Sequence, residues 1–373
     1  MREYTAADVL RVAKRVNNPK RNYLLVDPLQ GKHIPASPVD GLAMMGALGT
    51  RVREAYPDAK LVIGFAETAT AVGAEVARTL GPETVYLTTT REPLAGEALS
   101  FLEEHSHAAD QQLSLKGLDR WLSQTGTVVF VDDEFSTGKT LRNMIRQLED
   151  ACPALRGKRL AAASVLNRLS SADLQTLSET GVESLSLVSL PPEDYEARVR
   201  SWTVRPAEVP ASDRAEPWEI LETGVRPGDP RAGVSIGPYA EACLQTAEEL
   251  WERLRDRLPR NGAVLTLGTE ECMYPAFRLG KLLEERLPGA RLRCHATTRS
   301  PIGIGDLPDY PVRNGFRLRS LYDPGRTTFV YNLEPCEAVI LLSDARGNRT
   351  DGLRDLASAL GRFGAPKLYF AEV

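Results

Sequence analysis

The residues best suited to chemistry in this chain lie in one continuous segment, residues 128–141. Four consecutive apolar residues, 128–131, predict a strand buried on both faces. Asp132 and Asp133 follow at once. Ligands of open α/β sheets lie at the carboxyl ends of such strands, where adjacent carboxylates can accept hydrogen bonds from the two hydroxyls of a vicinal diol. The segment therefore predicts a site for a diol at the end of a buried strand.

The turn that follows the two aspartates has the features of a phosphate site. It offers hydroxyls, backbone N–H groups and the N-terminus of a helix, all of which favour a terminal phosphate. Its residues are Glu134, Phe135, Ser136, Thr137, Gly138, Lys139 and Thr140. A diol and a phosphate bound by one loop describe a 5-phosphorylated ribose.

Two other interpretations apply to a loop of this composition. Gly138, Lys139 and Thr140 match the last three residues of a P-loop, but Asp133 stands where that motif needs its first glycine, so a P-loop is excluded. Alternatively, Asp132 and Asp133 only cap a helix that follows a buried strand. The capping interpretation accounts for the two acids and leaves the hydroxyl-rich turn unexplained.

The elements that must position this loop alternate between short apolar runs and amphipathic stretches. Strands are predicted at residues 22–26, 61–65, 84–88, 127–131, 159–166 and 184–190. Between the second and third, Val72, Val76, Ala77 and Leu80 follow helical spacing, and Gly81 ends the helix. This alternation predicts an α/β fold with a mostly parallel sheet covered by helices on both faces.

Length and composition predict two globular domains. A chain of 373 residues exceeds the size at which one hydrophobic core stops growing. Apolar periodicity fades where five prolines accumulate between residues 205 and 233. We therefore predict a first domain over residues 1–205, a linker over 206–233 and a second α/β domain over 234–373, which opens with a helix at 239–258.

The second half repeats features of the first. Residues 61–67 and the later Thr-Thr-Arg at 89–91 match residues 264–271 and the Thr-Thr-Arg at 297–299, so that Glu67 pairs with Glu271 and Arg91 with Arg299. Residues 338–344 fall where the diol segment should recur, but the double acid and the turn are gone. A degenerate duplication explains this pattern, and the alternative is two unrelated domains with the common strand-glycine-helix pattern.

Composition narrows the class of partner. A net charge of −4 argues against duplex nucleic acid as the main ligand. No apolar run is long enough to cross a membrane and no secretory signal opens the chain, so we expect a cytoplasmic protein. The five cysteines never form a Cys-x-x-Cys pair, which favours neither a disulfide framework nor a zinc site.

Residues 128–141 resemble the signature loop of the type I phosphoribosyltransferases, which include the orotate, adenine and hypoxanthine enzymes. The two-domain layout is similar to phosphoribosyltransferases whose C-terminal domain is named for a Thr-Arg-Ser-Pro motif, present here at residues 298–301. Such proteins are typical of bacterial stress-response gene clusters of the tellurium-resistance type. The resemblance spans nearly the whole chain, and the signature loop is its most specific part.

The resemblance implies transfer of a 5-phosphoribosyl group from phosphoribosyl pyrophosphate (PRPP) to an unidentified base-like acceptor, with release of pyrophosphate. Asp132 and Asp133 would hold the ribose hydroxyls and residues 135–140 the 5-phosphate. Arg91 would neutralise the diphosphate, which the family binds on the loop after the first strand of this domain. The loop residues here are Ala66, Glu67, Thr68, Ala69 and Thr70. Mg²⁺ would be held near Asp132 and Asp133, largely through water and substrate.

Alternatives stay open for the remaining candidates. Glu67 is either a magnesium or substrate contact or an ordinary helix-start carboxylate, and Arg91 is either a diphosphate contact or a surface residue. Further candidates for substrate contact, each equally explained as a solvated residue, are Lys32 and His33 on an expected exposed turn and His105 and His107 in an expected mobile loop. In the second domain, Glu271, Arg299 and Ser300 could carry chemistry of their own, but we expect that domain to bind or shape a substrate or to mediate assembly, because it lacks the two diol acids.

Two classes of function remain at this point. One is the transferase, expected to act as a homodimer because relatives often dimerise. The other is a regulatory protein that binds PRPP or a nucleotide without turnover. Release of pyrophosphate in the presence of an acceptor separates the two classes.

Overall fold

The computed structural model describes residues 2–16, 18, 21–101, 111–211, 217–347, 349–364 and 366–373. The chain forms two compact units. The N-terminal unit comprises Met1–Ala6, Ala43–Glu193 and Gly228–Glu241, and the C-terminal unit comprises Ala7–Leu42, Asp194–Pro227 and Ala242–Val373. Contacts therefore group residues 7–42 with the second half of the chain, whereas the sequence places them in a domain over residues 1–205.

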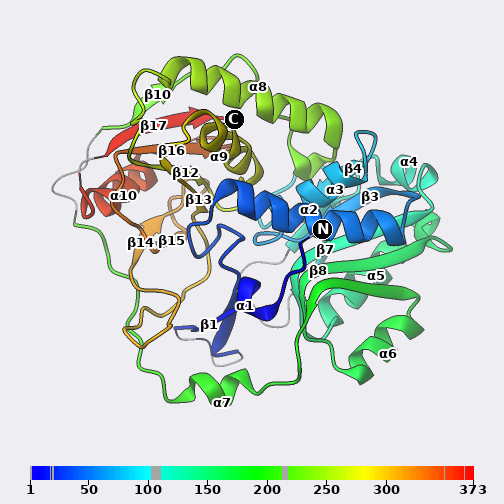
Figure 1. Cartoon of the computed structure of the whole chain (residues 1–373). Coiled ribbons are helices and arrows are strands. Elements are labelled where there is room, and N and C mark those ends of the chain that lie inside the picture. Colours follow the sequence, from blue (N-terminus) through cyan, green and yellow to red (C-terminus); the bar gives the residue numbers. More distant parts are fainter. Residues whose placement is uncertain are drawn as a thin grey trace. The chain divides into compact units, whose positions relative to one another are not determined.

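A sheet in the order β11-β4-β3-β7-β8-β9 forms the centre of the N-terminal unit (Figure 1). Its strands are β3 (Ala59–Gly64), β4 (Val85–Thr88), β7 (Thr127–Phe135), β8 (Arg159–Asn167), β9 (Val182–Ser189) and β11 (Val234–Ser235). All neighbours are parallel except β11, which pairs antiparallel with β4. The predicted α/β class with a parallel sheet is confirmed. Strand β7 continues to Phe135 rather than ending at Val131, because it pairs with β8 as far as Asn167.

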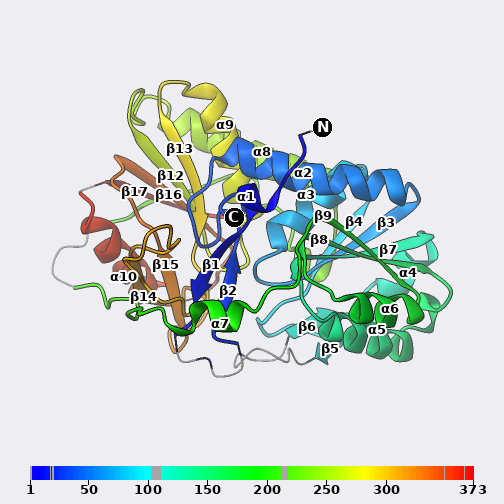
Figure 2. The same cartoon turned by 60° about the horizontal axis from the view of Figure 1, so that its bottom comes forward.

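Helices cover both faces of this sheet (Figure 2). One face carries α2 (Pro38–Ala55) and α3 (Thr70–Leu80), and the other carries α4 (Leu118–Ser123), α5 (Lys139–Ala151) and α6 (Ser171–Glu179). Val128 and Phe130, two residues apart on β7, share a core with residues 141, 144, 145 and 148 of α5. Alternation in the strand and helical spacing in α5 bring these apolar residues together. The unit also contains η1 (Pro153–Leu155), η2 (Pro230–Ala232) and a small antiparallel sheet of β5 (Ala98–Phe101) and β6 (Gln111–Ser114).

The C-terminal unit contains a parallel sheet in the order β10-β17-β16-β12-β13. Its strands are β10 (Glu219–Leu221), β12 (Ala263–Gly268), β13 (Arg291–Ala296), β16 (Ala338–Ser343) and β17 (Lys367–Glu372). Helices α8 (Ile236–Leu254) and α9 (Tyr274–Arg286) lie on one face and α10 (Thr350–Gly361) on the other (Figure 2). Strand β10 lies within the segment predicted as a linker. Three residues with one exposed isoleucine, Ile220, give no strand signal in the sequence.

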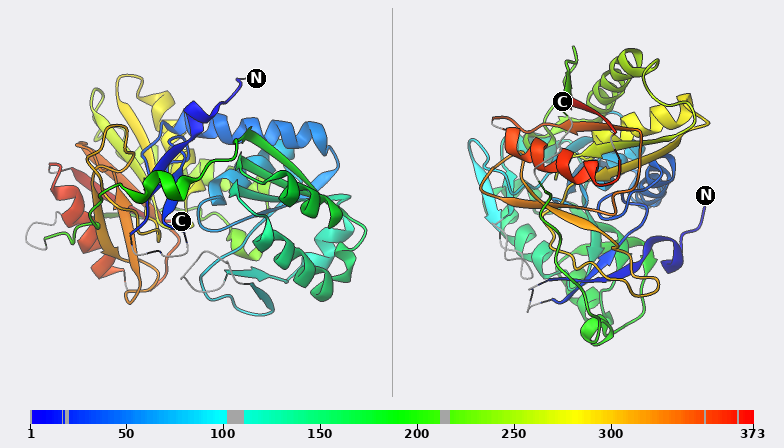
Figure 3. Two further views of the ribbon diagram at one scale, coloured as in Figure 1. Left: turned by 90° about the horizontal axis from the view of Figure 1, so that it is seen from below. Right: turned by 90° about the vertical axis from the view of Figure 1, so that its left-hand side faces the viewer.

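Two hairpins complete the C-terminal unit. Strands β1 (Arg11–Lys14) and β2 (Tyr23–Val26) form one, which is flanked by the short helices α1 (Ala6–Val9) and α7 (Tyr195–Arg200). Strands β14 (Gly315–Arg319) and β15 (Thr327–Tyr331) form the other, on the same side of the sheet as α10 (Figure 3). None of the described helices is both long and apolar enough to cross a membrane.

The two units share one architecture. Strands β13, β12, β16 and β17 follow the order of β4, β3, β7 and β8, with α9 and α10 in the places of α3 and α5. A hairpin stands between the second and third of these strands along the chain in both units, β5–β6 in one and β14–β15 in the other. The edge strand differs, because β9 follows β8 whereas β10 precedes the whole sheet.

Backbone hydrogen bonds fix the register of this repeat. Thr89 N donates to Gly64 O at 2.9 Å, and Thr297 N donates to Gly268 O at 3.0 Å. The β3–β7 pairing joins Gly64 to Val131, and the β12–β16 pairing joins Gly268 to Leu342. Counting from these anchors, Glu67 corresponds to Glu271 and Arg91 to Arg299, as the sequence repeat predicts. Asp133 corresponds to Asp344, so one of the two acids recurs after all.

Candidate functional site

The candidate site lies at the carboxyl edge of the N-terminal sheet, where β3, β4 and β7 end. After β3 the chain crosses to β4 on one side, and after β7 it crosses to β8 on the other side. The boundary between β3 and β7 is thus the point where the direction of winding reverses, which is where ligands of doubly wound sheets bind. The predicted diphosphate loop follows β3, and the predicted diol and phosphate loop belongs to β7 and the turn after it.

The two predicted diol acids lie at this boundary. Asp132 and Asp133 are both partly exposed. Thr68 Oγ1, from the loop after β3, donates a hydrogen bond to Asp133 Oδ1 at 2.9 Å. Asp133 N donates to Asp132 Oδ1 at 2.9 Å. The structure therefore brings both acids and the predicted diphosphate loop together, with both carboxylates hydrogen-bonded to protein donors and partly exposed.

The predicted phosphate turn, residues 134–140, runs from the end of β7 to the start of α5. Phe135 is buried in the core shared by β7 and α5, so its side chain anchors the turn. Gly138 has φ +67°, a left-handed conformation that a side chain disfavours, and it immediately precedes α5. Because glycine has no side chain to cap the helix, the amides of the first turn of α5 face the loop without a competing cap from that position. Ser136, Thr137 and Thr140 are partly exposed, and Lys139 is exposed.

Glu134 forms an ion pair within the loop. Arg168 Nη1 lies 2.9 Å from Glu134 Oε1, and the two side chains are only 17% and 9% exposed, respectively. Arg168 N also donates to Phe135 O at 2.8 Å. Through these two contacts, the segment after β8 fastens the end of β7 in place.

The loop after β3 is shaped by residues that the sequence did not single out. The Ala66–Glu67 peptide bond is cis. Ala66 N donates to Thr89 Oγ1 at 2.8 Å, and the side-chain amide of Gln111 donates to Ala66 O at 3.0 Å. Gln111 and Thr89 also hydrogen-bond to each other, and both are fully buried. The recurring Thr-Thr-Arg could have identified Thr89, but no sequence pattern marks Gln111.

The remaining candidates of the N-terminal unit differ in exposure. Glu67 is 7% exposed, and Thr70 is buried at the start of α3. Arg91 is partly exposed and follows Thr90, whose backbone exchanges two hydrogen bonds with Gln112. That pairing fixes the backbone from which the Arg91 side chain extends. His105 and His107 lie outside the described residues.

Lys32 and His33 belong to the C-terminal unit and are buried, at 0% and 1% exposure, so the expectation of an exposed turn is wrong. Lys32 Nζ donates to Glu270 O at 2.5 Å. Asn332 Nδ2 donates to His33 O at 3.0 Å. These contacts span more than two hundred residues of sequence, which is why a local pattern could not reveal them.

The C-terminal candidates gather at the carboxyl edge of their own sheet. Arg299 Nε donates to Glu270 Oε2 at 2.6 Å, and Arg299 Nη2 lies 3.7 Å from Glu271 Oε1. The backbone of Ser300 accepts a hydrogen bond from Tyr331 Oη at 2.8 Å. Glu270, which the sequence did not single out, is the carboxylate closest to Arg299.

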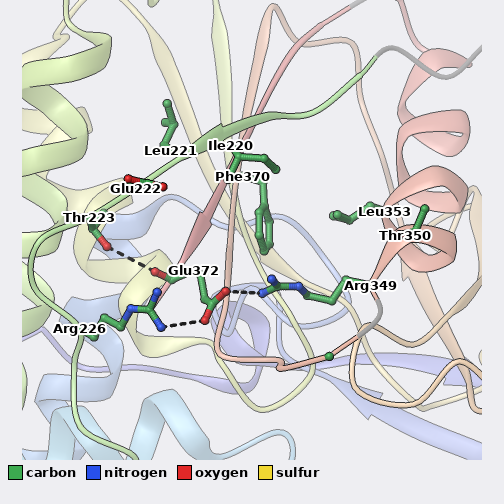
Figure 4. Close-up of a pocket in the computed structure, with 11 residues that line it drawn as sticks. Ile220, Leu221, Glu222, Thr223, Arg226, Arg349, Thr350, Leu353, Phe370 and Glu372 are labelled. Carbon is green, nitrogen blue, oxygen red and sulfur yellow. Dashed lines mark hydrogen bonds and ion pairs between the residues drawn. The ribbon is translucent and has the colours of Figure 1, made fainter.

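A separate cavity of about 490 Å³ lies in the C-terminal unit (Figure 4). Arg226 and Arg349 both donate to the carboxylate of Glu372, each at 2.8 Å. The hydrogen bond from Arg349 is the main reason why the pKa of Glu372 lies below its ordinary value. The remaining lining is mixed, with apolar side chains such as Ile220 and Phe370 beside the polar side chains of Glu222, Thr223 and Thr350. None of the residues predicted from the sequence lines this cavity.

Comparison with known proteins gives one family match in each half of the chain, and the first includes residues 9–42, which contacts group with the C-terminal unit. Residues 9–190 match the family model described as phosphoribosyl transferase. Residues 231–360 match the model described as the TRSP domain C terminus to PRTase_2. The first match thus covers most of the N-terminal half of the chain, and the match to the TRSP domain follows it. No curated protein sequence matches the chain.

Solved structures of phosphoribosyltransferases resemble the same half of the chain. The adenine phosphoribosyltransferase of Rhodothermus marinus is 17% identical with a TM-score of 0.33, covering 49% of this chain and 96% of that one. The APRTase of Giardia lamblia is 18% identical with a TM-score of 0.37, covering 50% and 97%. The orotate phosphoribosyltransferase of Aeropyrum pernix is 19% identical with a TM-score of 0.31, covering 52% and 92%.

Proposed function

We propose that the N-terminal unit transfers a 5-phosphoribosyl group from PRPP to a base or base-like acceptor and releases pyrophosphate. The observation that carries this proposal is the juxtaposition of Asp132 and Asp133 with the loop after β3 through the Thr68–Asp133 hydrogen bond. One edge of the sheet thereby offers acceptors for a diol, amides for a 5-phosphate and a loop for a diphosphate. The phosphoribosyl transferase family match over residues 9–190 supports the reaction class.

The ribose is bound by acceptors and its phosphate by donors. The carboxylates of Asp132 and Asp133 accept hydrogen bonds from the 2- and 3-hydroxyls, and a hydrogen bond to a charged group contributes about 1.5–3 kcal/mol. The turn after β7 and the first turn of α5 donate backbone N–H groups to the 5-phosphate. These two ends fix the sugar so that its C1 faces the loop after β3.

Transfer breaks the bond between C1 and the diphosphate oxygen, which keeps the electron pair. The acceptor nucleophile forms the new bond to C1 from the opposite face and loses its proton to solvent or a nearby base. Positive charge develops on the sugar as the diphosphate leaves. Arg91 and the amides after β3 stabilise the leaving group, and removing one such preorganised donor typically costs about 100-fold in rate. The protein needs no covalent nucleophile, because positioning and electrostatics suffice.

The carboxylates fit a magnesium ion that is held mainly by substrate and water. Among the described residues, no three histidines, cysteines, aspartates or glutamates cluster as a metal site. Mg²⁺ usually keeps several waters and is bound through one or two carboxylates plus substrate phosphates. Asp132 and Asp133 would hold the ion in that way, and it would neutralise part of the diphosphate charge. We further propose that the chain acts as a homodimer.

Calorimetric titration of PRPP with magnesium into the full chain tests the proposal. The Asp132→Asn, Asp133→Asn variant should bind about 10- to 100-fold more weakly, because neutral amides replace charged acceptors. A matched control, Asp150→Asn with Asp256→Asn, removes two charges from side chains that are 74% and 83% exposed, and its affinity should be unchanged. Equal affinity for wild type and the Asp132, Asp133 variant would overturn the site.

A second measurement separates transfer from sensing. Wild type is incubated with PRPP, magnesium and a panel of nucleobases and related nitrogen heterocycles, and pyrophosphate is measured by an enzyme-coupled assay. Acceptor-dependent release that is lost in the Asp132→Asn, Asp133→Asn variant supports the transferase. Tight PRPP binding without release for any acceptor in the panel would instead favour a regulatory protein that binds PRPP.

A further inference from the structure

At the carboxyl edge of its sheet, the C-terminal unit has the same backbone arrangement as the candidate site, but there it carries the carboxylate of Glu270. Ala66 N donates to Thr89 Oγ1 at 2.8 Å, and Glu270 N donates to Thr297 Oγ1 at 3.0 Å. Glu270 therefore occupies the backbone position of Ala66. The corresponding positions differ in one respect that matters for ligands, because alanine ends at a methyl group and glutamate carries a negative charge.

The Glu270 carboxylate is surrounded by cationic and hydroxyl donors. It lies 2.6 Å from Arg299 Nε and 3.1 Å from Arg326 Nη2, and it accepts a hydrogen bond from Ser320 Oγ at 2.5 Å. The glutamate is 1% exposed, while the arginine side chains are 11% and 21% exposed. Lys32 Nζ adds a third cation beside the Glu270 backbone. A buried carboxylate is tolerated only with such partners.

Arg299 is the counterpart of Arg91, the arginine proposed to face the diphosphate. A guanidinium presents a planar fork of N–H donors that fits carboxylate and phosphate oxygens alike. In the N-terminal unit Ala66 supplies no carboxylate to this position. In the C-terminal unit the side chain of Glu270 supplies one, and Arg299 is already bound to it.

The positions that correspond to Asp132 and Asp133 are also hydrogen-bonded to protein side chains in the C-terminal unit. Asp344 stands in the place of Asp133 and accepts a short hydrogen bond from Tyr322 Oη. Ser343 stands in the place of Asp132, and its hydroxyl lies 2.8 Å from that of Thr269. Tyr322 Oη also lies 3.0 Å from Thr269 O. Residues 320–326, which join β14 to β15, thus supply Ser320, Tyr322 and Arg326 to this edge of the sheet.

We propose that Glu270 takes the place of a bound diphosphate in the C-terminal unit, so that this unit holds an anion site filled by the protein itself and each chain binds a single PRPP. The inference rests on the proposed function in one respect, the assignment of Arg91 to the diphosphate. Removing the Glu270 carboxylate should leave Arg299 and Arg326 facing one position and open the site to inorganic pyrophosphate, with Lys32 close by on the Glu270 backbone carbonyl.

The native chain gives the first test. Calorimetry with PRPP and magnesium should show one molecule per chain, and two molecules per chain, the second lost in Arg299→Met, would overturn the inference. Absence of any PRPP binding by wild type would count against the proposed function of the N-terminal unit instead. Pyrophosphate binding by a chain that lacks the N-terminal site tests the C-terminal unit separately.

That experiment uses a full chain in which the N-terminal site is silenced by Arg91→Met, Asp132→Asn and Asp133→Asn. Without further change, it should bind no pyrophosphate. Adding Glu270→Ala should create one pyrophosphate site per chain, and adding Arg299→Met should abolish it again. The neighbouring Glu271→Ala is the matched control and should create no site. Both substitutions remove one glutamate, so a gain from net charge alone would appear in both.

Glu270→Gln provides a second variant in case alanine impairs folding, because it keeps the shape and removes only the charge. Far-UV circular dichroism checks folding, and a rise in melting temperature with pyrophosphate gives an independent readout of binding. Folded Glu270→Ala and Glu270→Gln chains that gain no pyrophosphate site would overturn the inference. Arg299-dependent pyrophosphate binding while Glu270 is intact would also overturn it.

Discussion

Thr68 joins the two loops of the candidate site through one side-chain hydrogen bond, from its hydroxyl to Asp133 Oδ1. Thr68→Val keeps the branched shape and removes the donor. A hydrogen bond to a charged group contributes about 1.5–3 kcal/mol. We therefore expect PRPP to bind about 10-fold more weakly in calorimetry, because the Asp133 carboxylate loses the donor that orients it toward the ribose.

The control for this prediction is Thr246→Val in the C-terminal unit. The Thr246 hydroxyl donates to Val225 O at 3.1 Å, so the same chemical change removes a hydrogen bond far from the candidate site in sequence. PRPP affinity should be unchanged in the control. An unchanged affinity in Thr68→Val as well would show that Asp133 is oriented without the Thr68 hydroxyl.

His295 makes the stability of the C-terminal unit depend on pH. Its ring nitrogens lie 3.3 Å from Gly31 O and 2.7 Å from Tyr331 O. Burial, which disfavours the charged imidazolium, is the main cause that lowers the pKa of His295 from 6.5 to about 4, and the charge of Lys32 adds to it. The unfolded chain therefore takes up a proton near pH 6.5 that the folded chain refuses until about pH 4.

The contribution of His295 to the free energy of unfolding is therefore fully present above pH 6.5 and is lost as the pH falls toward 4. A shift of this size corresponds to roughly 3 kcal/mol over that interval. Urea unfolding of wild type, followed by tryptophan fluorescence, should show a falling midpoint between pH 7 and pH 5. His295→Gln cannot take up the proton, so its midpoint should fall less steeply. Identical slopes for the two proteins would contradict this origin of the pH dependence.

At the scale of elements, the turn between β7 and α5 depends on a left-handed glycine. Gly138 has φ +67°, and an added Cβ would lie 3.5 Å from Leu169, an ordinary contact. Gly138→Ala should therefore cost about 1 kcal/mol of stability through the backbone alone. If the amides of this turn hold the 5-phosphate, relaxation of the turn should also weaken PRPP binding, which calorimetry measures.

Gly157 offers a matched control in the same unit. It has φ +83°, and an added Cβ would meet no atom within 4 Å. Gly157→Ala should lose a similar amount of stability in urea unfolding, and its PRPP affinity should remain that of wild type. An equal loss of affinity in both variants would mean that general destabilisation, and not the geometry of the phosphate turn, governs binding.

The elements also show which parts of the structure the sequence can predict. The buried strand and the acids at its carboxyl end were predictable because they are contiguous in the sequence, whereas the continuation of β7 to Phe135 was not, because it depends on pairing with β8. The correspondence of Arg91 with Arg299 was predictable because the repeat preserves spacing. The contacts of Gln111 with Ala66, and of Lys32 with Glu270, join distant segments, and no local period encodes them. Strand β10 was missed for a different reason, since three residues are too few to show alternation.

At the scale of the whole molecule, one architecture appears twice with different charges at corresponding positions. Arg91 stands beside a loop whose residue 66 is alanine, whereas Arg299 is bound to the carboxylate of Glu270. Duplication followed by loss of a ligand position is a simple account of this difference. It assigns ligand binding to one unit and a buried ion network to the other, although both have the same arrangement of strands and helices.

The two arginines test this division of roles as a matched pair. Arg91→Met should weaken PRPP binding about 10- to 100-fold, because the bound diphosphate loses a charged donor, while the urea midpoint stays close to that of wild type. Arg299→Met should do the opposite: PRPP affinity stays unchanged, and stability falls by about 3 kcal/mol, since breaking a buried pair leaves an undercompensated carboxylate. Calorimetry and urea unfolding on both variants provide the four measurements. A loss of PRPP affinity in Arg299→Met without loss of stability would instead place the C-terminal arginine in contact with substrate, and the two units would then share the work of binding.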